Sequence, residues 1–257
     1  MPGGPDALDW LGRPLDCAAC RFGDLPTRRQ CAPGWSCAFD RYAPRIARFF
    51  TMNPEAADLC LDAPGPGTRA HAARVASVFR LRPLLDDADA QVRAVAVLRL
   101  PAAQARALLR DPDREVRIAL AWRLPFADLA PLLDDADAQV RLVVARRADP
   151  GVLPLLLHDP DPEIRRMVAG RIGLRWLEAL LADPDPLVRR AVARRLAPER
   201  LGVLEADADM RVRHAVAERA GAGLARRLLA DPEAPVREAA ATRLAELSAE
   251  REPDVER

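Results

Sequence analysis

From about residue 60 onward, apolar and polar positions alternate along the chain in a pattern that recurs every 24 residues. Residues 105–128 form one such unit, in which Val116, Ala119, Leu120 and Leu124 are spaced i, i+3, i+4 and i+8. This spacing places the four side chains on one stripe of a helix. One short unit cannot bury its own apolar stripe, so the fixed period predicts a stacked array of helical units.

Several columns of residues keep this register without any insertion. A Val–Arg pair, or Ile–Arg in one unit, begins at Val92, Val116, Val140, Ile164, Val188, Val212 and Val236. A leucine column consists of Leu84, Leu108, Leu132, Leu156, Leu180, Leu204 and Leu228. An aspartate column consists of Asp87, Asp111, Asp135, Asp159, Asp183, Asp207 and Asp231. A weaker copy at Thr68-Arg69 extends the array to about eight units, so we expect a helical repeat domain over residues 60–248.

The unit at 105–128 also carries signals for where its helix begins and ends. Asp is a good N-cap and Pro suits the first helical position, so Asp111 and Pro112 predict a helix that opens at Asp111. Pro125 is expected to end it. The period leaves only about ten residues for the preceding element and its turns, which favours a short 3₁₀ helix.

The Arg and Asp columns, Arg93 to Arg237 and Asp87 to Asp231, have two interpretations. They could form a charged stripe that binds a partner, or a structural ladder in which each Arg binds a nearby Asp or a helix-end carbonyl. The two columns balance in sign and the formal net charge is +1, which favours the ladder. All 39 basic residues are Arg, but the near-neutral total provides no global field for nucleic acid or an anionic membrane.

The first 50 residues lack the repeat pattern and contain Cys17, Cys20, Cys31 and Cys37 in the spacing C-x2-C-x10-C-x5-C. Thiolates bind soft metals and clusters, and a small apolar-poor segment gains most from such a staple. The residues alone leave three possibilities: two disulfides, which a reducing cytosol disfavours, a structural zinc site, which is slightly favoured, or an iron–sulfur cluster. We expect a Cys-rich metal domain at 1–59 and a charged, frayed tail at 249–257.

The fifth cysteine, Cys60, stands one period before Leu84, so we expect a core residue rather than another thiol at the metal. His71, His158 and His214 share no repeat column and assemble no ligand set. The tryptophans are expected to shield the metal site or to fill the core and groove; they are Trp10, Trp35, Trp122 and Trp176.

The chain contains no phosphate loop, no Ser-His-Asp arrangement and no HExxH motif, so we do not expect an enzyme. It has no secretory signal and no apolar stretch of membrane-spanning length, which predicts a cytoplasmic protein.

Together the two parts resemble the leucine-rich repeat variant (LRV) family. The resemblance is carried by 24-residue units such as residues 84–101 and by the preceding cysteines. It implies an all-α, right-handed solenoid of alternating α and 3₁₀ helices behind a small iron–sulfur domain. It also implies a [4Fe–4S] cluster with Cys17, Cys20, Cys31 and Cys37 as ligands, which replaces the slight preference for zinc. The first repeat departs from the family pattern at Ala63, Gly65 and Thr68, so its helix cap is in question.

We therefore expect a non-enzymatic interaction protein that docks a protein partner on a concave or groove face, with a cluster in a structural or redox-sensing role. The alternative is a nucleic-acid-binding solenoid with a metal-stapled arm, supported by the Arg columns and Arg28-Arg29. Overall neutrality weighs against this alternative, because such binding needs several uncompensated cations.

Overall fold

The computed structural model describes residues 6–249 of the 257-residue chain. Those residues contain helices, turns and two isolated β-bridges, but no β-strand, in agreement with the all-α expectation. The structure divides into two compact units, Met1–Val143 and Val144–Arg257, and the division falls within helix α6. The tail expected at 249–257 lies outside the described residues apart from Ala249, which is the last residue of α11.

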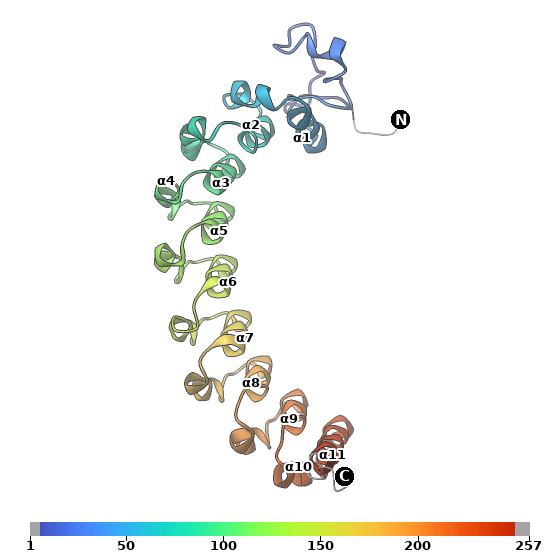
Figure 1. The fold of residues 1–257 in the computed structure, drawn as a ribbon, viewed down its shortest axis with the longest axis vertical. Helices are drawn as coiled ribbons and strands as arrows, with labels where there is room; N and C mark the ends of the chain where they lie inside the picture. The colour runs from blue at the N-terminus through green and yellow to red at the C-terminus, as the bar shows by residue number, and fades with distance from the viewer. Residues whose placement is uncertain (1–5, 250–257) are drawn as a thin grey trace, which may run out of the picture. The chain divides into compact units, whose positions relative to one another are not determined.

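The first unit begins with turns and one 3₁₀ helix, and continues with α-helices that alternate with short elements (Figure 1). Its elements are η1 (Leu25–Arg28), α1 (Ala43–Met52), η2 (Pro54–Cys60), α2 (Pro66–Ala73), η3 (Val78–Arg80), η4 (Arg82–Asp86), α3 (Ala90–Arg99), α4 (Ala102–Ala105), η5 (Arg106–Leu108), α5 (Arg114–Arg123), η6 (Phe126–Asp128), η7 (Ala130–Leu132) and the start of α6 (Ala138–Arg147). Helices α1, α2, α3 and α5 pack side by side in that order.

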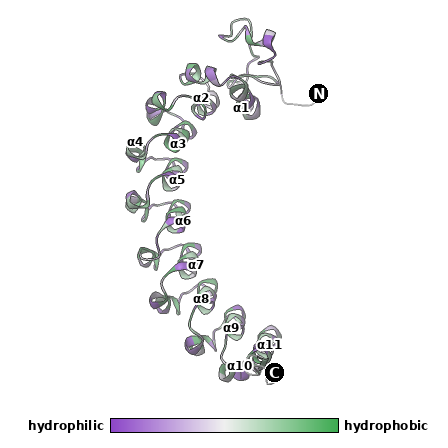
Figure 2. Cartoon of the chain, in the orientation of Figure 1, coloured by the Kyte–Doolittle hydropathy of each residue, from purple (hydrophilic) through white to green (hydrophobic). Residues whose placement is uncertain are grey.

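The second unit repeats the same alternation. Its elements after α6 are η8 (Leu153–Leu156), α7 (Pro162–Arg171), η9 (Leu174–Leu180), α8 (Pro186–Ala193), η10 (Pro198–Leu204), α9 (Met210–Ala217), α10 (Ala222–Leu228) and α11 (Ala234–Ala249). Helices α7, α8, α9 and α11 form one row of neighbours. Figure 2 shows hydrophobic and hydrophilic residues mixed along each of these helices, as expected for helices that bury only one face.

The apolar columns of the sequence form the cores of the two units. Each Val or Ile of the Val–Arg pairs, from Val92 to Val236, is fully buried. The leucine column is buried as well, with Leu108 half-buried as its exception. The prediction that identical units bury their stripes against one another is therefore confirmed.

The predicted N-cap of the repeat helix is wrong by two residues. Helix α5 begins after Asp113, whose carboxylate accepts a hydrogen bond from the backbone N–H of Glu115 at 2.8 Å. Asp111 instead accepts a hydrogen bond from the N–H of Asp113 at 2.9 Å and closes the turn before the helix. Pro112 therefore lies in this turn. The other end is as predicted, because the helix stops at Arg123, shortly before Pro125.

The structural ladder is the correct interpretation of the Arg and Asp columns. Arg93 donates from Nε and Nη2 to both carboxylate oxygens of Asp111, at 2.7 and 2.8 Å. Its Nη1 donates to the carbonyl oxygen of Asp87 in its own unit, at 2.8 Å. Ion pairs of this type at 2.7 Å are Arg69–Asp87, Arg93–Asp111, Arg117–Asp135, Arg165–Asp183, Arg189–Asp207 and Arg213–Asp231.

A second arginine column was not anticipated. Arg219 lies just past α9 and donates to the carbonyl oxygens of Ala193 and Leu196, each at 2.7 Å, at the end of the preceding repeat helix. Cations placed at a helix C-terminus satisfy its free carbonyls and oppose its dipole. Equivalent hydrogen bonds to the preceding helix end are made by Arg99, Arg123, Arg171, Arg195 and Arg243. The 24-residue spacing of these arginines was visible in the sequence.

The atypical residues of the first repeat contact the Cys-rich segment. Gly65 precedes α2 without any side-chain cap, as its identity suggested. A Cβ atom at Gly65 would lie 3.1 Å from Cγ of Trp10, so glycine leaves room for that ring. Thr68 is buried and donates its hydroxyl to the carbonyl oxygen of Ala38 at 2.6 Å. These departures from the repeat therefore form the junction with the N-terminal segment.

Candidate metal centre

The first two cysteines are held by a capped turn. The carboxylate of Asp16 accepts hydrogen bonds from the N–H groups of Ala18 and Ala19, at 3.0 and 3.1 Å. The N–H of Cys20 donates to the carbonyl oxygen of Cys17 at 3.4 Å. The N–H of Phe22 donates to Sγ of Cys20 at 3.5 Å. Both sulfurs of the CxxC pair can therefore reach one centre from a single turn.

The other two cysteines flank a tight loop and are buried. An isolated bridge between Ala32 and Ser36 closes the loop between Cys31 and Cys37. The N–H of Cys37 donates to the carbonyl oxygen of Arg45 in α1 at 3.3 Å. Arg45 is buried and pairs with the fully buried Asp40 at 3.1 Å. This ion pair anchors the loop to α1, so the second pair of thiols has a fixed position.

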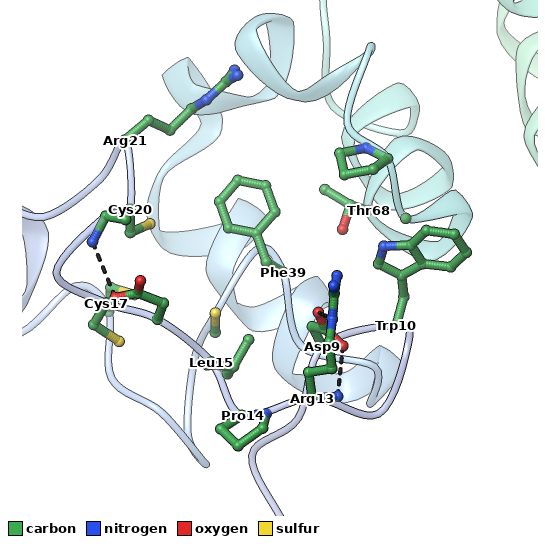
Figure 3. A pocket seen from close by; sticks show the side chains of 16 residues that line it. Asp9, Trp10, Arg13, Pro14, Leu15, Cys17, Cys20, Arg21, Phe39 and Thr68 are labelled. Carbon is green, nitrogen blue, oxygen red and sulfur yellow. Dashed lines mark hydrogen bonds and ion pairs between the residues drawn. The ribbon is translucent and has the colours of Figure 1, made fainter.

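All four cysteines line one hollow of about 700 Å³. Figure 3 shows Cys17 and Cys20 on one side of this hollow and Trp10 and Thr68 on the other, with the ring of Phe39 between them. The structure thus places all four predicted ligands around one hollow, although ten residues of sequence separate the pair Cys17 and Cys20 from the pair Cys31 and Cys37.

Three of these thiols, those of Cys17, Cys31 and Cys37, have shifted pKa values. A hydrogen bond with Cys37 lowers the pKa of Cys31, and the same bond raises the pKa of Cys37. Partial burial raises the pKa of Cys17, and the charges of Cys37 and Cys20 add to this effect. Mutual repulsion of this kind is what a bound cation relieves, because metal binding requires deprotonated thiols.

The donor set fits a soft metal or an iron–sulfur cluster. All five cysteines of the chain are free thiols, so the disulfide interpretation does not hold here. Among residues 6–249, no three Cys, His, Asp or Glu side chains converge closely enough to enclose a single metal ion. Arg13 and Arg21 also line the hollow, and Arg13 is paired with Asp9 of the same lining at 3.0 Å. The four cysteines are therefore the residues of this hollow that could hold a cluster.

Cys60 takes the core role expected of it. It is fully buried at the end of η2 and does not line the hollow. Burial raises the pKa of Cys60 to about 12, so its thiol stays protonated at neutral pH.

The histidines and most tryptophans lie elsewhere. None of the three histidines lines the hollow, and His214 lies 3.8 Å from Glu218 on another part of the chain. Trp10 is the tryptophan at the hollow, and Trp35 lies nearby in sequence with the guanidinium of Arg48 over its ring at 5.8 Å. Trp122 lines a groove between α3 and α5, which is the other position expected for the tryptophans.

Comparison with known proteins gives a match in each part of the chain. Residues 7–59 match the family model described as "LRV protein FeS4 cluster". A segment of 105 residues, 41% of the chain, is 60% identical to an uncharacterized 27.7 kDa protein in the nifB 3' region of Rhodobacter capsulatus and spans 43% of that protein. A solved structure described as a leucine-rich repeat variant with a novel repetitive structural motif superimposes with a TM-score of 0.84.

That solved structure is 40% identical in sequence, and the match covers 90% of this chain and 99% of the other. The family expected from the repeat units and cysteines is thereby confirmed, together with the repeat fold and the presence of an FeS4 cluster domain. No helix among the described residues is both long enough and apolar enough to cross a bilayer. The chain belongs to the leucine-rich repeat variant family.

Proposed function

We propose that this protein is a non-enzymatic, cytoplasmic interaction scaffold, with a [4Fe–4S] cluster in a structural or redox-sensing role. The cluster would be bound by Cys17, Cys20, Cys31 and Cys37. The observation that carries the cluster assignment is that all four line one hollow within the segment that matches an FeS4 family model. Ligation by four cysteines leaves no iron position open for a substrate, which supports a role other than catalysis.

The surrounding residues suit a sensing role. A bound cluster would supply one-electron chemistry, with a potential tuned by hydrogen bonds and solvent exposure. Cys31 and Cys37 are buried, whereas Cys17 is exposed and brings one edge of the site to the surface. The N–H of Phe22 directed at Cys20 would stabilise negative charge on that sulfur.

The cofactor is tested by purifying the full chain without oxygen and recording its visible spectrum, iron and sulfide content. We expect a brown protein that bleaches on oxidation or reduction. A colourless protein with one equivalent of zinc would overturn the redox role.

The ligand set is tested with a matched pair of cysteine variants. Cys31→Ser should lose the visible absorption, because Cys31 faces the hollow. Cys60→Ala should keep it, because Cys60 is a core residue outside the hollow. Full cluster content in the Cys31→Ser protein would show that the ligands are assigned wrongly.

The scaffold role is supported by an apolar groove between α3 and α5. Its lining includes Leu98 of α3 together with Ile118 and Trp122 of α5, and Leu98 and Trp122 are 51% and 53% exposed. Exposed aromatic and aliphatic side chains that share a hollow are typical of protein contact sites. At one end the groove is edged by the carboxylates of Asp113 and Glu115.

The acidic end of the groove between α3 and α5 indicates what kind of partner segment binds there. Asp89 lines the groove together with Asp113 and Glu115, and Arg74 is the arginine of the lining; Glu115 is paired with Arg114 at 3.2 Å, which leaves two carboxylates and Arg74. An amphipathic helix of a partner protein fits best, with apolar side chains on the groove and Lys or Arg at its acidic end.

This docking site is tested with a labelled amphipathic helical peptide that carries lysines at one end. Leu98→Ala and Trp122→Ala should each weaken its binding by about tenfold, whereas Phe79→Ala, which removes a side chain that is 91% exposed outside the groove, should not. Pull-downs with cluster-loaded and cluster-stripped protein then ask whether the cluster state affects docking. Equal binding by all three variants would contradict the assignment.

The alternative of nucleic-acid binding has lost most of its support. The arginines that suggested it are committed to aspartates and helix-end carbonyls within the repeats. Arg28 lies 3.9 Å from the carboxylate of Asp24. The arginines of these columns are therefore not available to a phosphate backbone, which weighs against this alternative.

A further inference from the structure

The eight repeats share one fold, so residues at equivalent positions can be compared between them. Two columns lie on the helix faces that line grooves between successive α-helices. The first column is Ala70, Ala94, Ile118, Leu142, Arg166, Arg190, His214 and Glu238. The second column is Arg74, Leu98, Trp122, Arg146, Gly170, Arg194, Glu218 and Thr242. Because equivalent positions carry apolar, cationic and acidic residues in turn, the fold does not dictate their chemistry.

The cationic members of these columns meet in one groove of the second unit. Arg166 and Gly170 of α7 face Arg190 and Arg194 of α8 across a hollow of about 460 Å³, and Leu187 contributes apolar surface. Ala191 and Arg195 complete the lining, and we call this hollow the cationic groove.

Unlike the ladder arginines, Arg190 and Arg194 of the cationic groove have no aspartate partner in the described part of the chain, so their guanidinium groups are available to bind a ligand. Within the described residues, no carboxylate lies within 4.0 Å of the guanidinium groups of Arg190 or Arg194. Arg166 is 3.9 Å from Glu163, and both side chains are 49% exposed, which is a weak contact. Three guanidinium groups thus share one hollow with little compensation, while the fourth, that of Arg195, donates to the carbonyl oxygen of Ala169 at 2.8 Å.

Gly170 supplies an independent observation. It lies in the last turn of α7, where glycine is less favourable than alanine. A Cβ atom there would meet nothing within 4 Å, so packing does not require glycine. Its effect is to leave the floor of the cationic groove open between Arg166 and Arg194.

We propose that the cationic groove binds an acidic segment of a partner protein, with carboxylates paired to Arg190 and Arg194. This inference rests on the proposed interaction role. The two arginines are four residues apart, so their Cβ atoms lie about 5–6 Å apart on the helix surface. Alternate residues of an extended peptide are separated by about 6.6 Å, which matches a Glu-x-Glu or Asp-x-Asp pattern. The planar fork of arginine binds carboxylates bidentately.

A protein segment fits this groove better than a nucleic acid. Leu187 and the arginine stems offer apolar surface to the intervening side chain of a peptide. Nucleic-acid binding draws on many phosphate contacts, and three arginines within one groove provide few.

The test uses the full chain and a fluorescein-labelled peptide of alternating Glu and Ala with a central Leu. The comparison ligands are the same peptide with Gln for Glu and a single-stranded oligonucleotide of equal charge. We expect the Glu peptide to bind, more weakly at high salt, and the Gln peptide not to bind.

Three variants make the test specific to the groove. Arg190→Glu combined with Arg194→Glu should weaken binding of the Glu peptide by at least about tenfold. Gly170→Leu should also weaken it by filling the floor, while the melting temperature stays equal or rises. The matched control is Arg226→Glu, a charge reversal at an exposed arginine of α10 outside the groove, which should bind normally.

Each opposite result overturns the proposal. Equal affinity for the Glu and Gln peptides, or full binding by the Arg190→Glu, Arg194→Glu protein, removes the acidic segment as ligand. Tighter binding of the oligonucleotide than of the Glu peptide assigns the groove to nucleic acid instead. The groove at Leu98 and Trp122 is assayed separately with a lysine-bearing peptide, so the scaffold role can survive failure here.

Discussion

At the scale of single residues, the aspartates of the ladder are largely buried, although aspartate is usually a surface residue. Asp111 has only 2% of its side chain exposed, and its partner Arg93 has 12%. Such a carboxylate receives two hydrogen bonds from the arginine and one from the backbone of the following turn. Removing one partner of a largely buried pair leaves the other charge uncompensated, which costs far more than losing a surface ion pair.

Adjacent aspartates provide a matched test of this point. Asp135 pairs with Arg117 at 2.7 Å and also accepts the N–H of Asp137 at 2.9 Å, whereas Asp134 beside it is exposed. We expect Asp135→Ala to lower the free energy of unfolding by about 2–4 kcal/mol. Asp134→Ala should change it by less than about 0.5 kcal/mol. Urea unfolding followed by circular dichroism measures both, and equal effects would contradict the buried ladder.

The same pairs make stability depend on pH in the acid range. The hydrogen bond from Arg189 holds the pKa of Asp207 below its usual value of 3.8, and that from Arg213 does the same for Asp231. A lowered pKa in the folded state stabilises the fold above the unfolded pKa, and this stability is lost as pH falls through the folded pKa. We therefore expect a flat unfolding free energy between about pH 7 and pH 5, and a decline below about pH 4.

The corresponding control is a protein with Asp207→Asn and Asp231→Asn. It should be less stable at neutral pH and should lose less stability on acidification, because two of the titrating groups are gone. An acid decline as steep as that of the unchanged protein would show that other carboxylates cause it.

At the scale of elements, each repeat helix depends on two aspartates with separate tasks. Asp113 caps α5, and Asp111 closes the preceding turn and receives Arg93. The sequence predicted the helix, its buried stripe and its end at Pro125. It could not separate the two aspartates, because either one is an acceptable N-cap when only local preferences are considered. The tertiary contact with Arg93 decides between them.

Two glycines of the repeat helices should respond to alanine in opposite directions. Gly170→Ala should raise the free energy of unfolding by about 0.5–1 kcal/mol, since nothing lies within 4 Å of the new methyl group. Gly65→Ala should lower it by about 1 kcal/mol, because Trp10 lies 3.1–3.3 Å from the added atom and must move. Thermal melting measures the sign of each change. Stabilisation of both proteins would mean that the Trp10 contact is not a constraint.

At the scale of the molecule, the cluster domain is joined to the repeats through contacts with the first repeat. Thr68 donates its hydroxyl to the carbonyl oxygen of Ala38, and Gly65 accommodates the ring of Trp10. The fixed 24-residue spacing predicted the repeats across most of the chain. The cysteine spacing predicted which four cysteines line the hollow. It did not predict that Arg13, Arg21 and Phe39 also line it, because irregular loops carry no periodic signal.

Nearest-neighbour coupling predicts how far loss of the cluster is felt. Removing the metal with a chelator under reducing conditions should increase hydrogen exchange in residues 7–59 and in α2, which contacts that segment. Exchange in α8 and α9 should stay unchanged, because each repeat contacts only its neighbours. Mass spectrometry of peptic fragments measures both regions. A uniform increase along the chain would mean that the repeats unfold as one cooperative body.

Each ladder arginine pairs with the aspartate of the following repeat, and this arrangement allows the number of repeats to change. Every such pair spans 18 positions, with its two members in successive copies, so duplicating or deleting one whole 24-residue segment recreates the same partner at each junction. Unequal recombination between copies would then yield longer or shorter proteins that fold without compensating substitutions. This gives evolution, or a protein engineer, a way to add or remove grooves of chosen charge while the cluster domain stays as it is.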